Sequence, residues 1–210
     1  MNVLTQTVLR EAQLLSMAST GPLRRDILAS LNELFKSFKH PYALIGGVAV
    51  LLHGFVRHTD DIDLMVDCST QDFARLHMYA NAQGFRASQS RTGNMLVMTH
   101  KASGAQVEIL RATSPAEKRG IQRAKSTNVL GTTFQVMTVE DIIILKIETV
   151  TKNPSRKTRD WPDVAGLLGI LKYPQDFNRV VSYVDSKGIP SVARKSWKAY
   201  VNAVRTLHDK

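Results

Sequence analysis

The most informative stretch of this sequence is Asp61-Ile-Asp-Leu-Met-Val-Asp67. In an extended chain, Ile62, Leu64 and Val66 fall on one face and Asp61, Asp63 and Met65 fall on the other, because side chains alternate along a strand. Such alternation is typical of a strand that is buried on one side. We therefore predict a strand over residues 61–67 whose second face carries two carboxylates.

A second signal lies thirteen residues upstream of this strand, at Gly46-Gly47. The pair follows a short apolar run, 42–45, that reads as a strand, and a helix is expected to start at Val48. Two glycines at such a turn let the backbone approach a ligand closely, and free N–H groups at the start of a helix attract anions. The sequence thus predicts a phosphate cradle at this turn.

A third carboxylate, Glu108, lies in the run 105–110, which we expect to form a hairpin with 95–99. Val107 and Ile109 point away from the face that carries Glu108. If this strand pairs beside 61–67, Glu108 joins Asp61 and Asp63 in one cluster.

Three clustered carboxylates beside a phosphate cradle suit metal-assisted phosphoryl transfer, or nucleotidyl transfer from an NTP. Oxygen ligands are those that Mg²⁺, or Mn²⁺, prefers. The metal neutralises the triphosphate and offsets the repulsion between the acids, which would otherwise raise their pKa values. We therefore predict a Mg²⁺ site formed by Asp61, Asp63 and Glu108.

The rest of the chain gives coarser signals. Helical spacing of apolar residues, with Ser69 or Thr70 and Thr138 as N-caps, predicts several helices. They cover 22–38 (opened by Gly21-Pro22), 70–83, 139–152, 156–171, 175–186 and 191–207. A further hairpin is expected around Gly131-Thr132. The fold class is α+β: a mixed sheet flanked by helices, with a core over 1–138, including an N-terminal helix, and a helical part over 139–210 packed on it.

The net charge of +10 lies almost wholly in the second half of the chain. Residues 1–110 hold 10 basic and 9 acidic side chains, whereas residues 111–210 hold 18 and 9. This bias suits a polyanionic partner such as RNA or a nucleoside triphosphate, and a solubilising surface is the alternative.

The expected location is the cytoplasm, without membrane contact. Apolar runs such as 44–52 are far shorter than the roughly 20 residues that cross a bilayer, and the first residues do not form an export signal. The single cysteine, Cys68, excludes an internal disulfide and a Cys-rich zinc site.

Taken together, the motifs resemble a known family. Gly46-Gly47 followed by Asp61-Ile-Asp63-Leu is similar to the signature of the DNA polymerase β-like nucleotidyltransferase superfamily. The segment 53–59 resembles its minimal bacterial branch, which includes the AbiEii and MenT toxins. Residues 138–146 and 156–164 are similar to that branch's Lys helix and its Arg-x-x-Arg-Asp-x-x-Asp helix.

The resemblance implies a role for each matching residue. Gly46 and Gly47 would bind the triphosphate, with Arg57 and Thr59 from the following loop. Lys146 would contact phosphate, and Asp160 would be its charge partner or a base. Where the family usually has Asp, this chain has Glu108, which is longer by one methylene group and could act as a base or as an outer acid.

The implied activity is Mg²⁺-dependent transfer of NMP from an NTP to tRNA or another RNA, as the toxin of a toxin–antitoxin system with a cognate antitoxin protein as partner. Two alternatives stay open. The acceptor could be a protein hydroxyl or a small antibiotic, or the chain could be a catalytically silent module that binds nucleotides or RNA. Arg57 could contact phosphate or orient Asp61, and Asp163 could simply pair with basic neighbours on a solvated helix.

Overall fold

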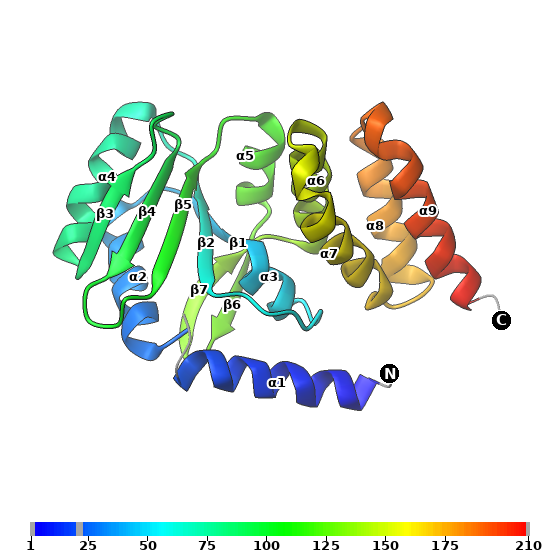
Figure 1. Ribbon diagram of the computed structural model, residues 1–210, viewed down its shortest axis with the longest axis horizontal. Helices are drawn as coiled ribbons and strands as arrows, with labels where there is room; N and C mark the ends of the chain where they lie inside the picture. The colour runs from blue at the N-terminus through cyan, green and yellow to red at the C-terminus, as the bar shows by residue number, and fades with distance from the viewer. Residues whose placement is uncertain (1–2, 20–22, 209–210) are drawn as a thin grey trace.

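The computed structural model describes residues 3–19 and 23–208, and a seven-stranded mixed sheet lies at its centre (Figure 1). The strand order is β3-β4-β5-β2-β1-β7-β6. The strands are β1 Tyr42–Ile45, β2 Asp61–Val66, β3 Phe85–Gln89, β4 Met95–His100, β5 Gln106–Arg111, β6 Lys125–Val129 and β7 Thr132–Val136. The central β2 pairs antiparallel with β1 and parallel with β5. The predicted α+β class is confirmed.

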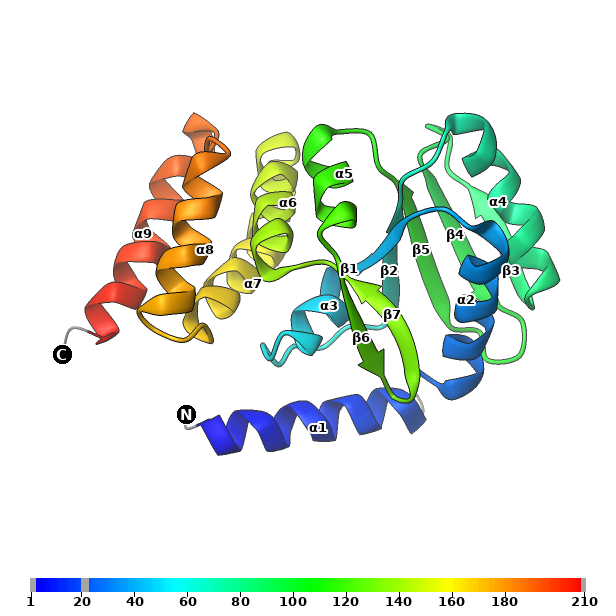
Figure 2. The same cartoon turned by 180° about the vertical axis from the view of Figure 1, so that it is seen from behind.

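Helices cover both faces of the sheet and extend beyond it (Figures 1 and 2). Helices α2 and α4 lie on one face, α3 and α5 lie on the other, and α6 to α9 form a helical part beside α5. The bounds are α1 Val3–Ser19, α2 Arg25–Phe38, α3 Gly46–Leu52, α4 Thr70–Ala82, α5 Pro115–Gln122, α6 Val139–Lys152, a 3₁₀ turn Pro154–Arg156, α7 Lys157–Gly169, α8 Gln175–Ser186 and α9 Ser191–His208.

Strand β2 has the predicted two-faced character. Ile62, Leu64 and Val66 are fully buried, whereas Asp61 and Asp63 are only partly buried on the opposite face. Burying three aliphatic side chains contributes roughly 1.5–3 kcal/mol each, so this register is strongly fixed. A slip by one residue would move both carboxylates into the core.

Two predicted N-caps define the starts of α4 and α6. The Ser69 side chain accepts a hydrogen bond from the Asp72 N–H at the start of α4, and the Thr138 side chain accepts one from the Asp141 N–H at the start of α6. Each bond satisfies an amide that has no partner within the first helical turn. The cap at Thr138 fixes where α6 begins and therefore where Lys146 lies.

Some predicted bounds were wrong, and three elements were not predicted. Helix α2 begins at Arg25 rather than at residue 22, and Gly21 and Pro22 lie outside the described residues. Helix α3 begins at Gly46 itself, so both glycines belong to its first turn. The helix expected over 156–171 is a 3₁₀ turn followed by α7. Helix α5 and strand β3 had no prediction, and neither did the span of α1.

Helix α1 runs along one side of the molecule, beneath α3 and the β6–β7 hairpin in Figure 1. The Gln13 side-chain amide donates to the backbone carbonyl of Arg57, 3.2 Å away, so α1 touches the loop between α3 and β2. Within the described residues, every helix is too short or too polar to span a bilayer.

Candidate active site

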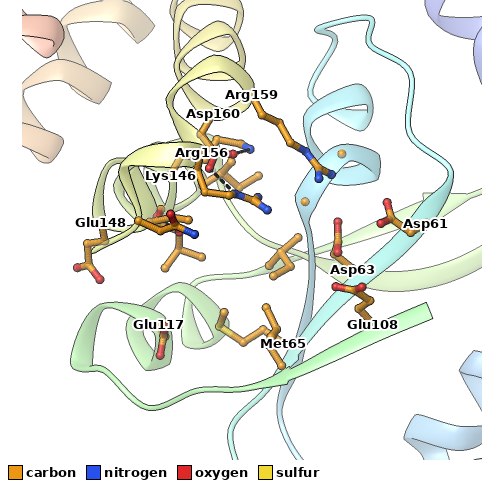
Figure 3. A pocket seen from close by; sticks show the side chains of 18 of the residues that line it. Asp61, Asp63, Met65, Glu108, Glu117, Lys146, Glu148, Arg156, Arg159 and Asp160 are labelled. Atoms are coloured by element: carbon orange, nitrogen blue, oxygen red, sulfur yellow. Dashed lines mark hydrogen bonds and ion pairs between the residues drawn. The ribbon is translucent and has the colours of Figure 1, made fainter. Parts of the chain in front are cut away.

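A cavity of about 440 Å³ opens between the sheet and the helical part, and its two walls carry opposite charges (Figure 3). Asp61, Asp63 and Glu108 line one side, and we name these three residues the acid wall. Lys146, Arg156 and Arg159, from α6, the 3₁₀ turn and α7, line the other; we name them the basic wall. Met65, Met95, Leu110, Ile142 and Leu145 line the space between them.

Strand pairing builds the acid wall. β2 and β5 are parallel neighbours, and Asp63 lies directly opposite Glu108. Residues opposite each other on paired strands project to the same face, so Glu108 reaches the face that carries Asp61 and Asp63. The condition that the sequence left open, that the two strands pair side by side, is thus met.

The acid wall is electrostatically strained. Burial, together with repulsion from Asp61 and Glu108, raises the pKa of Asp63 to about 6. A hydrogen bond from the Gly47 N–H and the charge of Arg159 act in the opposite direction. Ionised Asp63 is therefore stabilised only in part by the chain itself, and a cation at this wall would remove the remaining cost.

Glycine is required at the turn before α3 because Asp63 packs against it. Gly46 has φ +63°, and a Cβ built there would lie 1.7 Å from Oδ2 of Asp63. A Cβ at Gly47 would lie 2.6 Å from the side chain of Thr59. The Thr59 hydroxyl in turn donates to Oδ1 of Asp61 at 2.9 Å. The Gly-Gly turn and Thr59 thus fix the positions of both aspartates.

The basic wall contains a buried ion-pair network. The Lys146 ammonium group lies 3.0 Å from Oδ1 of Asp160 and 2.6 Å from Oδ2 of Asp163. Arg156 binds the other oxygen of Asp160 at 3.1 Å. Burial opposes ionisation of Asp160, but Lys146 and Arg156 outweigh it and hold the pKa of this carboxyl below its usual value. Asp160 is therefore placed as a charge partner of Lys146.

Arg57 and Asp163 lie differently from what the sequence suggested. Arg57 Nη1 donates to Oδ2 of Asp163 at 2.8 Å, so Arg57 joins the network around Lys146, and it is Thr59 that holds Asp61. Asp163 is buried, which rules out the interpretation that it is a residue of a solvated helix. Arg57 also lines the cavity.

Sequence reasoning missed Arg156 and Arg159 as residues of the site. Arg159 extends from α7 toward Asp63 (Figure 3), and its charge lowers the pKa of that carboxyl. Both arginines were seen only as parts of a helical motif. Their spacing of three residues, which places both side chains on one face of a helix, was the available signal.

The acid wall fits a hard divalent cation by its chemistry. It offers three carboxylates, the donor type that Mg²⁺ and Mn²⁺ prefer, and it lacks positive charge, as the raised pKa of Asp63 indicates. In the described part of the chain, however, no three His, Cys, Asp or Glu side chains meet closely enough to hold an ion. The acids share one cavity without converging on one point.

Replacing Gly46 by alanine tests how tightly the turn holds Asp63. The added Cβ forces the carboxylate away, and a displacement of about 1 Å at a reacting centre costs on the order of 10²-fold in rate. We expect a loss of that size in turnover, measured as release of the pyrophosphate that nucleotidyl transfer produces.

Gly131→Ala is the matched control, because Gly131 also has positive φ, +91°, but faces open space. It should lose about 1 kcal/mol of stability and no activity; equal activity in both variants would contradict the expectation.

Comparisons with known proteins complete the description of the site. The family model described as nucleotidyl transferase AbiEii toxin, type IV toxin–antitoxin system, matches residues 27–204. Among curated proteins, no sequence matches this chain.

Solved structures show a similar fold at low sequence identity. A nucleotidyltransferase-like antigenic protein from Paracoccidioides brasiliensis has 17% identity and a TM-score of 0.51, with 82% of this chain and 91% of that chain covered. The lincosamide antibiotic adenylyltransferase LnuA has 16% identity and a TM-score of 0.49, with 70% and 98% covered. A nucleotidyltransferase from Thermotoga maritima, described as putative, has 14% identity and a TM-score of 0.46, with 65% and 91% covered.

Proposed function

Because the chain belongs to the AbiEii nucleotidyltransferase toxin family, and is thus a nucleotidyltransferase, we propose that it transfers NMP from an NTP to a hydroxyl group of an RNA, foremost tRNA. The acceptor oxygen bonds to the α-phosphorus, the bond between the α-phosphorus and the bridging oxygen breaks, and pyrophosphate leaves. The hydroxyl proton passes to a carboxylate of the acid wall. One observation carries the proposal: a single cavity joins the acid wall to the basic wall.

The acid wall is the proposed metal and reaction side of the site. Asp61 and Asp63 would hold Mg²⁺ or Mn²⁺, with Glu108 as the third acid. When bound, such an ion neutralises phosphate oxygens and lowers the pKa of a nearby hydroxyl. Thr59 and the Gly46-Gly47 turn orient the aspartates, so their role is to position the acids.

The basic wall is the proposed grip on the triphosphate. Arg156 and Arg159 face the cavity, and Arg159 lies toward Asp63. Charged donors to phosphate oxygens form stronger hydrogen bonds than neutral ones. Lys146 contributes positive charge from within its network of aspartates. We propose that the division into 1–138 and 139–210 is also functional, with acids from the first part and most of the cations from the second.

RNA is the proposed acceptor because the second half of the chain is strongly basic, with 18 basic and 9 acidic residues in 111–210. RNA and NTPs share the cytoplasm, where we place the reaction. The toxin role that the family's description names is proposed for this chain too, with an antitoxin protein as partner. A companion reading frame beside this gene would support that role.

The test is a transfer assay with each α-labelled NTP, Mg²⁺ and total tRNA. We expect label in RNA with at least one nucleotide and none with an Asp61→Asn/Asp63→Asn variant. Label in protein or in an added aminoglycoside or lincosamide, with RNA unlabelled, would shift the acceptor to the alternatives. If RNA or nucleotide binds but no acceptor is labelled under any condition, the chain is a silent binding module and the proposal is wrong.

A further inference from the structure

Exposed basic residues gather at one end of the helical part, and one of them, Arg159, also lines the cavity. The turn that joins α6 to α7 and the turn that joins α8 to α9 lie at this same end in both views (Figures 1 and 2). Helices α7 and α9 start there and pack against each other. We name the exposed basic side chains at these helix ends the basic edge: Lys157, Arg159, Lys187, Arg194, Lys195 and Lys198.

In the described part of the chain, nearby acids do not hold the cations of the basic edge in ion pairs. Among the described residues, no ion pair involves any of its six members. The acids of α7, Asp160 and Asp163, are buried and bound to Lys146. On the adjacent α8, Asp185 accepts a hydrogen bond of 2.7 Å from the Trp197 indole and lines a small hollow together with Lys198.

The spacing along α9 arranges its cations as a face. From Ser191 to His208 the helix contains no Asp or Glu. At 3.6 residues per turn, Arg194, Lys198 and Arg205 fall within roughly 40° of one another around the helix axis. All three are exposed, and they border the buried stripe of α9 to which Trp197 and Val201 belong. The face therefore presents positive charge over most of the length of α9.

The composition of this surface favours a nucleic acid over an acidic protein. Protein–protein interfaces bury a core of apolar and aromatic side chains and are poor in lysine. The basic edge instead consists of lysines and arginines, four of the six being lysine. Repeated single cations on an exposed surface are the pattern that neutralises backbone phosphates.

We propose that the basic edge binds the phosphate backbone of an RNA acceptor and leads it from α9 to the cavity at Arg159. Arg159 belongs both to this edge and to the basic wall of the cavity, so the two surfaces are continuous. The inference rests on the proposed function, because it assigns the binding surface for that acceptor. In this arrangement the acceptor is a long polyanion, and the protein binds it at some distance from the hydroxyl group that reacts.

The test separates binding from catalysis by using full-length protein with Asp61→Asn/Asp63→Asn. Adding Lys195→Gln and Lys198→Gln should raise the Kd for tRNA about tenfold at 0.1 M salt and lower the slope of log Kd against log salt by about 2, since each lost phosphate contact removes about 1. The matched control is Arg86→Gln/Arg91→Gln, two exposed cations on and beside the edge strand β3, at the far end of the sheet. It should change the Kd less than twofold, and circular dichroism confirms that both variants are folded.

The outcomes distinguish this inference from the proposed function. Equal loss of affinity in the two pairs of variants would overturn the basic edge as the RNA site, and so would polyglutamate of matched charge binding as tightly as tRNA. If the Lys195 and Lys198 changes weaken tRNA binding while the active chain labels no RNA, the surface stands and the proposed acceptor reaction fails. If Lys195→Gln and Lys198→Gln are placed in the active chain and RNA is labelled with an unchanged KM, the inference fails and the reaction stands.

Discussion

Asp63→Asn is expected to lower nucleotidyl transfer at least about 10³-fold. A metal ion bound at the acid wall, as proposed, would contribute several kcal/mol of stabilisation to the transition state, and about 4 kcal/mol corresponds to that factor. Asparagine keeps the shape of the side chain and the contact with Gly47, so the loss isolates the charge. The measurement is initial-rate transfer from α-labelled NTP at saturating Mg²⁺.

The same substitution should stabilise the metal-free protein at neutral pH. The folded pKa of Asp63, about 6, lies above its ordinary value, so the folded state holds the proton more tightly than the unfolded state. Ionisation of Asp63 therefore does not lower the free energy of unfolding below pH ~4. The loss grows between pH ~4 and ~6, and at higher pH it reaches up to about 3 kcal/mol. Asparagine cannot ionise, so the free energy of unfolding of the variant does not fall in this pH range.

Urea titrations in EDTA at pH 4 and pH 7.5 check this expectation. Parent and variant should be similar at pH 4, and the variant should be more stable at pH 7.5. Added Mg²⁺ should stabilise only the parent, because an ion bound to the folded state shifts the unfolding equilibrium. A variant that is less stable than its parent at pH 7.5, or one that keeps a tenth of the activity, would refute the role given to Asp63.

Lys146→Met is expected to destabilise the protein by roughly 3–5 kcal/mol, because it leaves buried carboxylates without their central cation. Asp160 retains Arg156 and Asp163 retains Arg57, which places the cost toward the lower end of that range. Methionine preserves the apolar stem of lysine, so the lost charge dominates. Transfer activity should fall as well, since the basic wall loses its support.

Urea unfolding of matched variants distinguishes the loss of this buried lysine from the loss of an exposed one. Lys36→Met breaks an exposed pair with Glu33 and should cost less than about 1 kcal/mol. Adding Asp160→Asn to Lys146→Met should recover part of the stability but no activity, because one unpaired buried charge is removed. The network has no such role if Lys146→Met and Lys36→Met cost the same.

The sequence identified the fold because its central strand carries a strict alternation. The two faces of β2, the caps at Ser69 and Thr138 and the α8 and α9 helices were all readable from local patterns. Helix α5 was also readable, since Ser114-Pro-Ala-Glu117 forms a capping box with Pro in the first turn, but this signal was overlooked. Helix α1 could not be predicted from such patterns, because Val8, Leu9 and Leu15 are exposed and do not define a buried face.

The three acids, Lys146 and its partner Asp160 were predicted from the sequence, whereas Arg156, Arg159 and the partners of Asp163 were not. Spacing along one strand places Asp61 and Asp63 together, and alternation along a second strand selects Glu108. The partners of Asp163 depend on how α7 packs against the loop that holds Arg57, a contact between residues 106 positions apart. No local pattern encodes such a contact, so the sequence around Asp163 does not distinguish an exposed ion pair from a buried network.

The cavity is assembled from two segments of the chain, and this has a consequence for how such an enzyme can change. A chain that ended after β7 would keep all three acids and lose Lys146, Arg156 and Arg159. Conversely, exchanging the last four helices for another set would replace the grip on phosphate and the docking surface while leaving the reacting acids untouched. On the proposed division of roles, the helical part over 139–210 would determine substrate choice, and recombination there would change the acceptor.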